Sequence, residues 1–169
     1  MPERLVTATG VAIDVGPTTD ADHDELLALF RAIVAAGEGY PQAPGEAITA
    51  DAFDAYWLAP ATATVVARTT DGVLAGAYTM KANGPGRAAH VANAGYVVAD
   101  GLRGQGIGEA LVRHSFELAR AHGFDAMQFN FVFETNPARR LYERLSFADI
   151  GQVPDVIDGE AVHIYWRRL

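Results

Sequence analysis

The stretch DGLRGQGIGEALVRHSF, from Asp100 to Phe116, places three glycines within five positions and then turns into a helical pattern. Glycine loses more conformational freedom on folding than any other residue, so this cluster needs a reason. A flexible linker, a tight turn and a bound phosphate are the three candidates. The linker is excluded because a β-like run precedes the glycines and an amphipathic helical pattern follows them. The helix has a wide apolar stripe formed by Ile107, Leu111, Val112, Phe116, Leu118 and Ala119.

A helix that begins among glycines favours a phosphate site. Its first N–H groups lack partners and lie at the positive end of the helix dipole, and glycine lets a phosphate approach the backbone. Arg103 adds a cation with a planar fork. A Walker A loop would need lysine where Glu109 stands, and G-x-G-x-x-G counted from Gly104 would need glycine there. The pattern that fits is [RQ]-x-x-G-x-[GA], with Gly106 and Gly108; a plain tight turn stays the alternative.

Composition limits the classes of function. The chain has 169 residues, which fits one ordinary domain, and we expect a single domain over residues 1–169. Its formal net charge of −8 disfavours binding to nucleic acid and to acidic membranes. Without cysteine, disulfides, thiolate chemistry and thiolate metal sites are excluded. The start of the chain lacks the order of a signal peptide, and no apolar run approaches the roughly 20 residues of a membrane span, so we expect a cytoplasmic protein.

The chain pattern predicts an α+β fold. Regular elements follow one another without an obvious linker, repeat or low-complexity tract. Three β-like runs separated by TDG and NGPG turns predict an antiparallel meander. Strands are expected at residues 11–16, 62–69, 72–82, 90–99 and 125–133 and in a hairpin over 147–168, and helices at 18–37, 49–59, 136–145 and from the glycines to about 122.

Two strands carry informative side-chain patterns. In the run over 125–133, strict alternation predicts a core face and an opposite face. The core face would hold Met127, Phe129, Phe131 and Phe133, and the opposite face Gln128, Asn130 and Val132. A buried amide needs partners, and Asn93 lies on the strand expected beside Asn130. Gly95, within a β pattern, predicts a bulge.

Two motifs together resemble the GCN5-related N-acetyltransferase (GNAT) superfamily. VVADGLRGQGIGEALV is similar to that family's acetyl-CoA pyrophosphate motif, and NPARRLYERLSF to its next motif, except that Ser146 stands where glycine is usual. The resemblance implies a GNAT-like mixed, mostly antiparallel sheet of about seven strands flanked by helices. It also implies a splay between the fourth and fifth strands, which opens a cleft for the thioester.

The resemblance assigns the donor site. It implies acetyl-CoA as acyl donor, with no metal. The backbone at Val98 and the loop would hold the coenzyme, Asn136 would bond its pantetheine arm, and Tyr142 would contact and protonate the departing thiolate. The loop residues concerned are Arg103, Gly104, Gln105, Gly106, Ile107 and Gly108. For Asn136 an ordinary helix N-cap is the alternative, and for Tyr142 a core tyrosine.

The general base and the acceptor are less constrained. No carboxylate lies in the strand before the loop, so His90 and Glu134 are the candidate bases. Tyr40, Tyr56 and Trp57 could wall an apolar pocket, with a packing cluster as the alternative. The finer resemblance is to a branch that contains fungal azetidine-2-carboxylate acetyltransferases, and it implies acceptor contacts at Asn93 and Asn130.

The function that the sequence predicts is direct acetyl transfer to the amine of a small molecule, an amino acid or an analogue, in a ternary complex. No nucleophile motif suggests a covalent acetyl-enzyme. A peptide or protein N-acetyltransferase and a non-catalytic acyl-CoA-binding module are the alternatives. The family often dimerises, so the resemblance also allows a homodimer.

Overall fold

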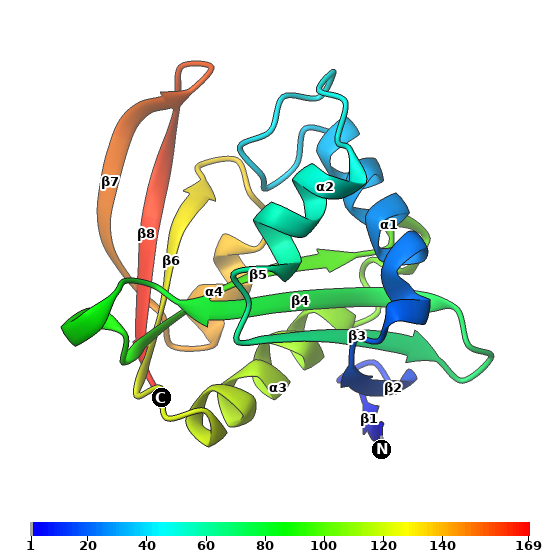
Figure 1. Cartoon of the computed structure of the whole chain (residues 1–169). Helices are drawn as coiled ribbons and strands as arrows, with labels where there is room; N and C mark the ends of the chain where they lie inside the picture. The colour runs from blue at the N-terminus through cyan, green and yellow to red at the C-terminus, as the bar shows by residue number, and fades with distance from the viewer. Residues whose placement is uncertain (1) are drawn as a thin grey trace.

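In the computed structural model, which describes residues 2–169, the chain forms one eight-stranded sheet with helices on both faces (Figure 1). The strand order is β1-β2-β3-β4-β5-β6-β8-β7, and every pairing is antiparallel except that of β5 with β6. The strands are β1 (Glu3–Val6), β2 (Ala12–Pro17), β3 (Ala63–Thr69), β4 (Leu74–Ala82), β5 (Val91–Val98), β6 (Ala126–Phe133), β7 (Ala148–Ile157) and β8 (Glu160–Arg168).

The helices follow the predicted order. They are α1 (His23–Ala35), α2 (Ala50–Phe53), α3 (Ile107–Ala121) and α4 (Arg139–Arg144), with short helical turns η1 (Asp20–Asp22), η2 (Asp54–Leu58), η3 (Gly86–Ala88) and η4 (Asp100–Leu102). The helix expected at 49–59 divides into α2 and the π-helical η2. The helix expected from residue 136 begins at Arg139 instead.

The expectation of about seven strands is wrong by one. The additional strand is β1, which holds only four residues and shows no alternating pattern. It pairs with β2 in four register positions, and Arg4 donates two hydrogen bonds of 2.8 Å to Asp14 on β2. Cross-strand contacts therefore define this strand more than its own sequence does.

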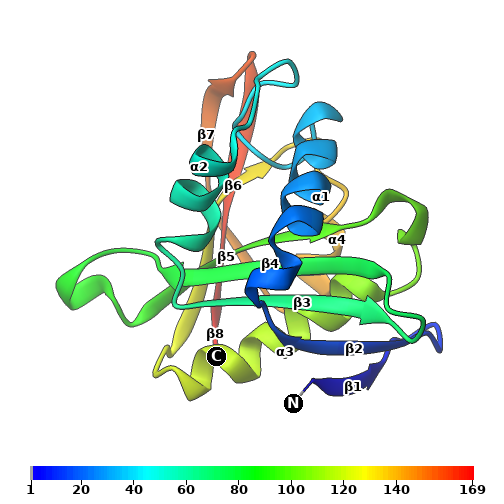
Figure 2. The same cartoon turned by 45° about the vertical axis from the view of Figure 1, so that its right-hand side comes forward.

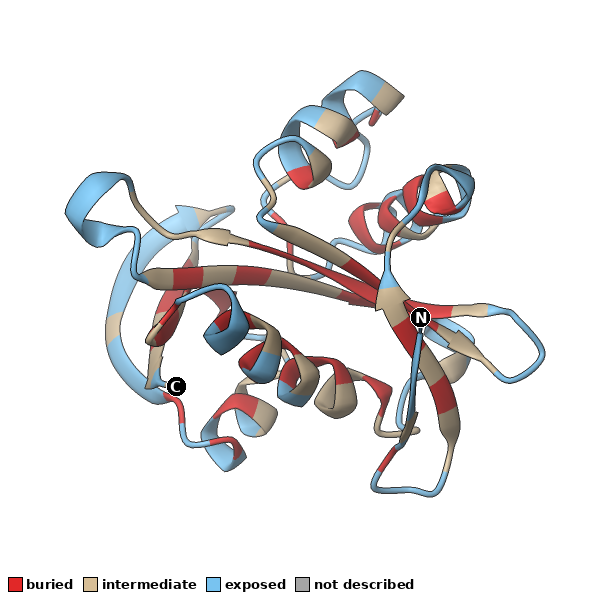
Figure 3. Ribbon diagram, turned by 60° about the horizontal axis from the view of Figure 1, so that its bottom comes forward, coloured by how far each residue is buried: buried red, intermediate tan, exposed pale blue. Residues whose placement is uncertain are grey.

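The sheet has a separate apolar core on each face. Helices α1 and α2 cover one face, and α3 and α4 cover the other, with the buried stripe of α3 turned toward the strands (Figures 2 and 3). Alternate residues of β5 divide between these cores: Ala92 and Ala94 pack toward α3, and Val97 packs toward α1. Asn93 and Gly95 therefore face the α1 side.

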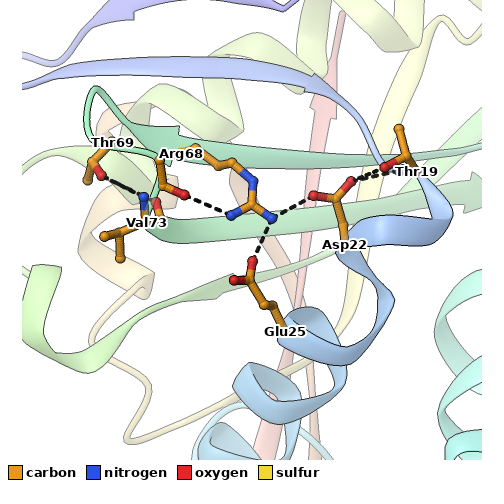
Figure 4. Close-up of polar contacts among 7 residues, drawn as sticks. Thr19, Asp22, Glu25, Arg68, Thr69 and Val73 are labelled. Atoms are coloured by element: carbon orange, nitrogen blue, oxygen red, sulfur yellow. Dashed lines mark hydrogen bonds and ion pairs between the residues drawn. The ribbon is translucent and has the colours of Figure 1, made fainter.

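An ion-pair network fixes α1 on the sheet. Arg68 on β3 lies 2.6 Å from carboxylate oxygens of both Asp22 and Glu25, at the start of α1 (Figure 4). Burial alone would raise the pKa of Asp22, but hydrogen bonds from Arg68 and Thr19 outweigh it and lower that pKa. The position of α1, and of the loop that follows it, is thus tied to β3.

The sheet splits between β5 and β6. Only two residue pairs join them, Val91 with Ala126 and Ala92 with Met127, and beyond these the strands diverge. The predicted splay between the strands at 90–99 and 125–133 therefore exists. On its other side β5 stays fully paired with β4 as far as Val98, so the gap opens on one edge of β5 only.

The bulge predicted at Gly95 is absent, because the β4–β5 register runs unbroken from Gly76 to Ala82. Glycine is needed there for another reason: a Cβ on Gly95 would lie 3.0 Å from the hydroxyl oxygen of Tyr40. The irregularity occurs in β6, where the register with β8 shifts between Phe129 and Val132. The shift interrupts the expected alternation, so Phe131 is 49% exposed and Val132 is buried, whereas Met127, Phe129 and Phe133 are buried as predicted.

A substitution at Gly76, on β4, tests how closely β4 packs against β5 and α3. A Cβ there would lie 2.7 Å from the Val97 carbonyl oxygen and 3.1 Å from Leu111. We predict that Gly76→Ala lowers the free energy of unfolding by about 1–3 kcal/mol, because β5 cannot move aside without losing its pairing. Gly151→Ala, whose added Cβ would meet nothing within 4 Å, is the matched control and should change it by less than about 0.5 kcal/mol. Urea unfolding measures both, and equal losses would contradict the prediction.

Candidate functional site

The glycine loop opens directly onto the N-terminus of α3. Gly104 and Gly106 both have φ of +75°, a left-handed conformation that glycine adopts without strain, and Gly106 is the N-cap of α3. Helix geometry leaves the first N–H groups of α3 without intrahelical partners. A Cβ on Gly108 would touch Val98 at 3.7 Å, so the helix starts against the end of β5. The helix N-terminus thus lies among glycines at the end of β5, which is the geometry that the glycine pattern predicts for an anion site.

The turn between β1 and β2 packs against the glycine loop. Thr9 donates a 2.7 Å hydrogen bond to the Gln105 carbonyl, and Thr7 lies 3.1 Å from where a Cβ on Gly106 would stand. Thr7 is itself held by Thr9 and by the Val11 N–H. Sequence reasoning missed these contacts, because nothing in the threonines signals a partner about 100 residues away in the chain.

Arg103 joins the glycine loop to a second loop. Its guanidinium lies 2.5 Å from Glu38, which follows α1, and 3.5 Å from Asp100. The hydrogen bond that Arg103 donates to Glu38 is the largest cause that raises the pKa of Arg103. The arginine predicted to face an anion is therefore held at the loop by carboxylates on two sides.

Asn136 and Tyr142 lie on the α4 side of the gap. Asn136 accepts a 2.9 Å hydrogen bond from the Ala138 N–H, an Asx turn just before α4; the N-cap of α4 is Ala138, so the N-cap alternative for Asn136 is wrong. Its amide nitrogen remains directed toward Gly39, 3.6 Å from the Cβ position there. The Tyr142 ring packs on Phe129, with centroids 4.7 Å apart. Among residues 2–169 no hydrogen-bond partner for the Tyr142 hydroxyl is seen, and burial raises its pKa, so it keeps its proton at neutral pH.

The backbone of β5 presents unpaired groups to the gap. Ala99 donates to the Ala75 carbonyl and Asn83 to the Val91 carbonyl, so odd-numbered residues of β5 face β4. Even-numbered residues such as Tyr96 and Val98 consequently turn their N–H and C=O groups toward the gap. One of these groups has a partner: Tyr40 donates a 3.2 Å hydrogen bond to the Tyr96 carbonyl.

A cluster of amides lies on the α1 face, where β5 and β6 converge. Asn83, which follows β4, accepts hydrogen bonds from Asn93 at 3.0 Å and from Asn130 at 2.6 Å. Asn130 in turn accepts from Gln128 at 2.8 Å. The two predicted asparagines thus meet through Asn83, which the sequence analysis did not single out. Lys81 lies opposite Asn93 in the β4–β5 register, on the same face.

The predicted aromatic wall is only partly present. Trp57 is 1% exposed and packs on Phe30 and Phe53, so it belongs to the core and has no surface for a substrate. Its prediction as a substrate-binding residue is corrected to the packing alternative. Tyr40 differs, because its ring is buried but its hydroxyl reaches the edge of β5.

The two candidate bases lie at different places. His90 is exposed beside η3, and its ring Nδ1 lies 2.9 Å from the Arg87 carbonyl oxygen. It precedes the closed end of the gap and is separated from Gly95 by about 16 Å of strand, so the structure does not bring it to the open end. Glu134 follows β6 at the open end and is exposed. Of the two candidate bases, Glu134 is therefore the one that follows β6 at the open end.

Within residues 2–169 no group of three or more His, Asp or Glu side chains is arranged to hold a metal ion. No helix in that range is long and apolar enough to cross a membrane.

The sequence and the fold are both similar to those of known proteins. Residues 26–147 match the model of the acetyltransferase (GNAT) family. A GCN5-related N-acetyltransferase from Kribbella flavida is 37% identical, with a TM-score of 0.85 over 93% of this chain and 98% of that one. A phosphinothricin acetyltransferase from Sinorhizobium meliloti, solved with acetyl-CoA, is 19% identical, with a TM-score of 0.78 over 93% of this chain and 88% of that one.

A curated relative matches part of the chain. The N-acetyltransferase aca1 of Schizosaccharomyces pombe is 41% identical over 83 residues, which is 48% of this chain and 40% of that protein. The chain thus aligns with less than half the length of this relative.

The loop geometry gives a paired test. Gly104 and Gly106 share the same left-handed φ, but only Gly106 has a neighbour, Thr7, within 4 Å of its Cβ position. We predict that Gly104→Ala costs about 1–2 kcal/mol of unfolding free energy from backbone strain alone. Gly106→Ala should cost more, because the hydrogen-bonded Thr7 must also move. Urea unfolding of both variants decides this, and a smaller loss for Gly106→Ala would refute the role given to the β1–β2 turn.

Proposed function

Because the chain belongs to the GNAT acetyltransferase family, we propose that it transfers an acetyl group from acetyl-CoA to the amine of a small molecule, with amino acids and their analogues as the acceptor class. The observation that carries this proposal is the gap between β5 and β6. A ligand can pair there with unpaired backbone while its phosphates reach the N-terminus of α3.

The donor side would bind acetyl-CoA through the glycine loop and β5. N–H groups at the start of α3, from Ile107 and Gly108, are suited to the pyrophosphate. The backbone groups of Val98 suit the amides of the pantetheine arm, and the free amide nitrogen of Asn136 adds a donor on the opposite side. Acetyl-CoA supplies the activated acyl group; all remaining chemistry belongs to the chain.

The chemistry would proceed by direct attack. The acceptor nitrogen forms a bond to the acyl carbon while the carbon–sulfur bond breaks. A β5 N–H that faces the gap, at Tyr96 or Val98, stabilises the negative charge that develops on the carbonyl oxygen. Tyr142, kept protonated by burial, donates its proton to the leaving sulfur and regains a proton from solvent before the next turnover. The amine loses its proton to solvent, with Glu134 as the carboxylate at that end.

The acceptor side would be formed by the amide cluster. Since both amide nitrogens of Asn93 and Asn130 bond to Asn83, the remaining amide nitrogen of Asn83 is a free donor. Together with the ammonium of Lys81 it suits a carboxylate, which favours an amino acid or an analogue. The match to the Schizosaccharomyces pombe N-acetyltransferase gives loose support to the fungal proline-analogue branch.

The test of the reaction uses purified protein, acetyl-CoA and a panel of amines that includes proline analogues, amino acids and short peptides. Release of the CoA thiol is followed, and acetyl-CoA affinity is measured by calorimetry. We predict turnover on at least one small amino acid, and a fall in kcat of about tenfold or more in Tyr142→Phe with little change in acetyl-CoA affinity. Preference for peptides would favour the peptide acetyltransferase. Saturable binding without turnover on any amine would favour the non-catalytic module.

The acceptor site has its own prediction. Asn83→Asp keeps the oxygen that accepts from Asn93 and Asn130, but replaces the free amide nitrogen by a charged oxygen. We predict that kcat/KM for a carboxylate-bearing acceptor falls at least about tenfold, because of lost hydrogen bonding and like-charge repulsion. Acetyl-CoA affinity should stay within about twofold. An unchanged kcat/KM, or an equal loss with the methyl ester of the same acceptor, would exclude carboxylate recognition at Asn83.

A further inference from the structure

The segment Glu38–Tyr40, just after α1, contacts three different parts of the donor site. Glu38 binds Arg103 of the glycine loop at 2.5 Å, and Gly39 lies beside the amide nitrogen of Asn136. Tyr40 donates to the Tyr96 carbonyl on β5 at 3.2 Å. Three consecutive residues thus cross the open end of the gap, from the face opposite α3.

The Tyr40 hydroxyl occupies a defined place in this crossing. It bonds to a carbonyl that faces the gap, and it lies 3.0 Å from the Cβ position of Gly95. Tyr40 comes from the α1 face, whereas Tyr142 comes from α4 on the other face. Tyr96, whose carbonyl accepts from Tyr40, and Tyr142 both pack on Phe129, with ring centroids 5.9 and 4.7 Å away. Burial is the main cause that raises the pKa of Tyr40; the neighbouring Tyr56 adds to it, and Tyr142 adds less. The two phenols therefore approach the same part of the gap from opposite faces.

The Tyr40 ring has little freedom to move away. It is 9% exposed and packs edge-on against Phe30, with centroids 5.0 Å apart. Tyr56 adds a second edge contact at 6.3 Å. Displacing the ring would open a void in the core between α1 and the sheet, with the cost of a buried aromatic contact.

From this placement we infer that Tyr40 sets the length of the acyl group that the gap accepts. The inference rests on the proposed function, because it takes the thioester to lie at Tyr142. An acyl chain that extends from that point toward the acceptor face meets the Tyr40 hydroxyl. An acetyl group ends before this wall, while each added methylene must share space with a ring that is packed in place. Tyr40 thus selects the acyl donor.

The experiment measures binding of acetyl-CoA, butyryl-CoA and CoA by calorimetry, so it requires no acceptor. In the parent protein butyryl-CoA should bind at least about tenfold more weakly than acetyl-CoA. Tyr40→Ala should bring the two affinities within about threefold of one another. Tyr40→Phe removes only the hydroxyl and keeps the ring, so its ratio of affinities should lie between those of the parent protein and Tyr40→Ala. If Tyr40→Ala does not fold, as judged by thermal unfolding, Tyr40→Leu replaces it.

A second variant tests the position of the hydroxyl. Gly95→Ala places a methyl group 3.0 Å from that oxygen and 3.7 Å from the nearest ring carbons, so the oxygen is the atom in conflict. Acetyl-CoA should bind about tenfold more weakly to Gly95→Ala, and Tyr40→Phe in the same chain should restore most of the affinity. No restoration, or a chain-length ratio unchanged in Tyr40→Ala, would overturn the inference. Failure of the parent protein to bind any acyl-CoA would instead overturn the proposed function.

Discussion

The site depends on how briefly β5 pairs with β6. Two residue pairs hold the halves of the sheet together, and the rest of β5 has one edge without a strand beside it. Backbone N–H and C=O groups require partners, so an open edge inside a domain must be satisfied by something other than a strand. Here the tyrosine from the loop after α1 satisfies one carbonyl, and the remaining groups are open to a ligand that pairs as a strand would.

The other features of the site follow from that opening. The parallel pairing requires a crossover from β5 to β6, and α3 supplies it, so the N-terminus of α3 stands at the open end of β5. Glycines at the turn let the helix start close to Val98. The gap also connects the two faces of the sheet, so that groups from α4 and from the α1 loop reach one place.

The sequence predicted those parts of the fold and of the site that depend on patterns among residues close together in the chain. The helix-start glycines, the amphipathic stripe of α3 and the order of elements are all local patterns, and the structure contains them. What was missed depends on contacts between distant segments. The β6 irregularity reversed Phe131 and Val132 because period-two counting assumes an unbroken ladder. Asn83 was overlooked because a polar residue in a turn is ordinary until two amides converge on it. Gly95 was noticed correctly but for the wrong reason, since its neighbour Tyr40 is 55 positions away.

The composition of the gap also bears on how an amine would lose its proton. Neither β5 nor β6 carries a carboxylate, and the tyrosines that approach the gap have raised pKa values that keep them protonated. Lys81, opposite Asn93, brings a positive charge to the acceptor face. A nearby cation disfavours the ammonium form of a bound amine and lowers its pKa, while amides that donate no charge do not oppose this. In the proposed reaction Lys81 also pairs with the acceptor carboxylate, so it offsets the rise that this carboxylate would cause in the pKa of the amine, and the demand on a general base such as Glu134 would be smaller.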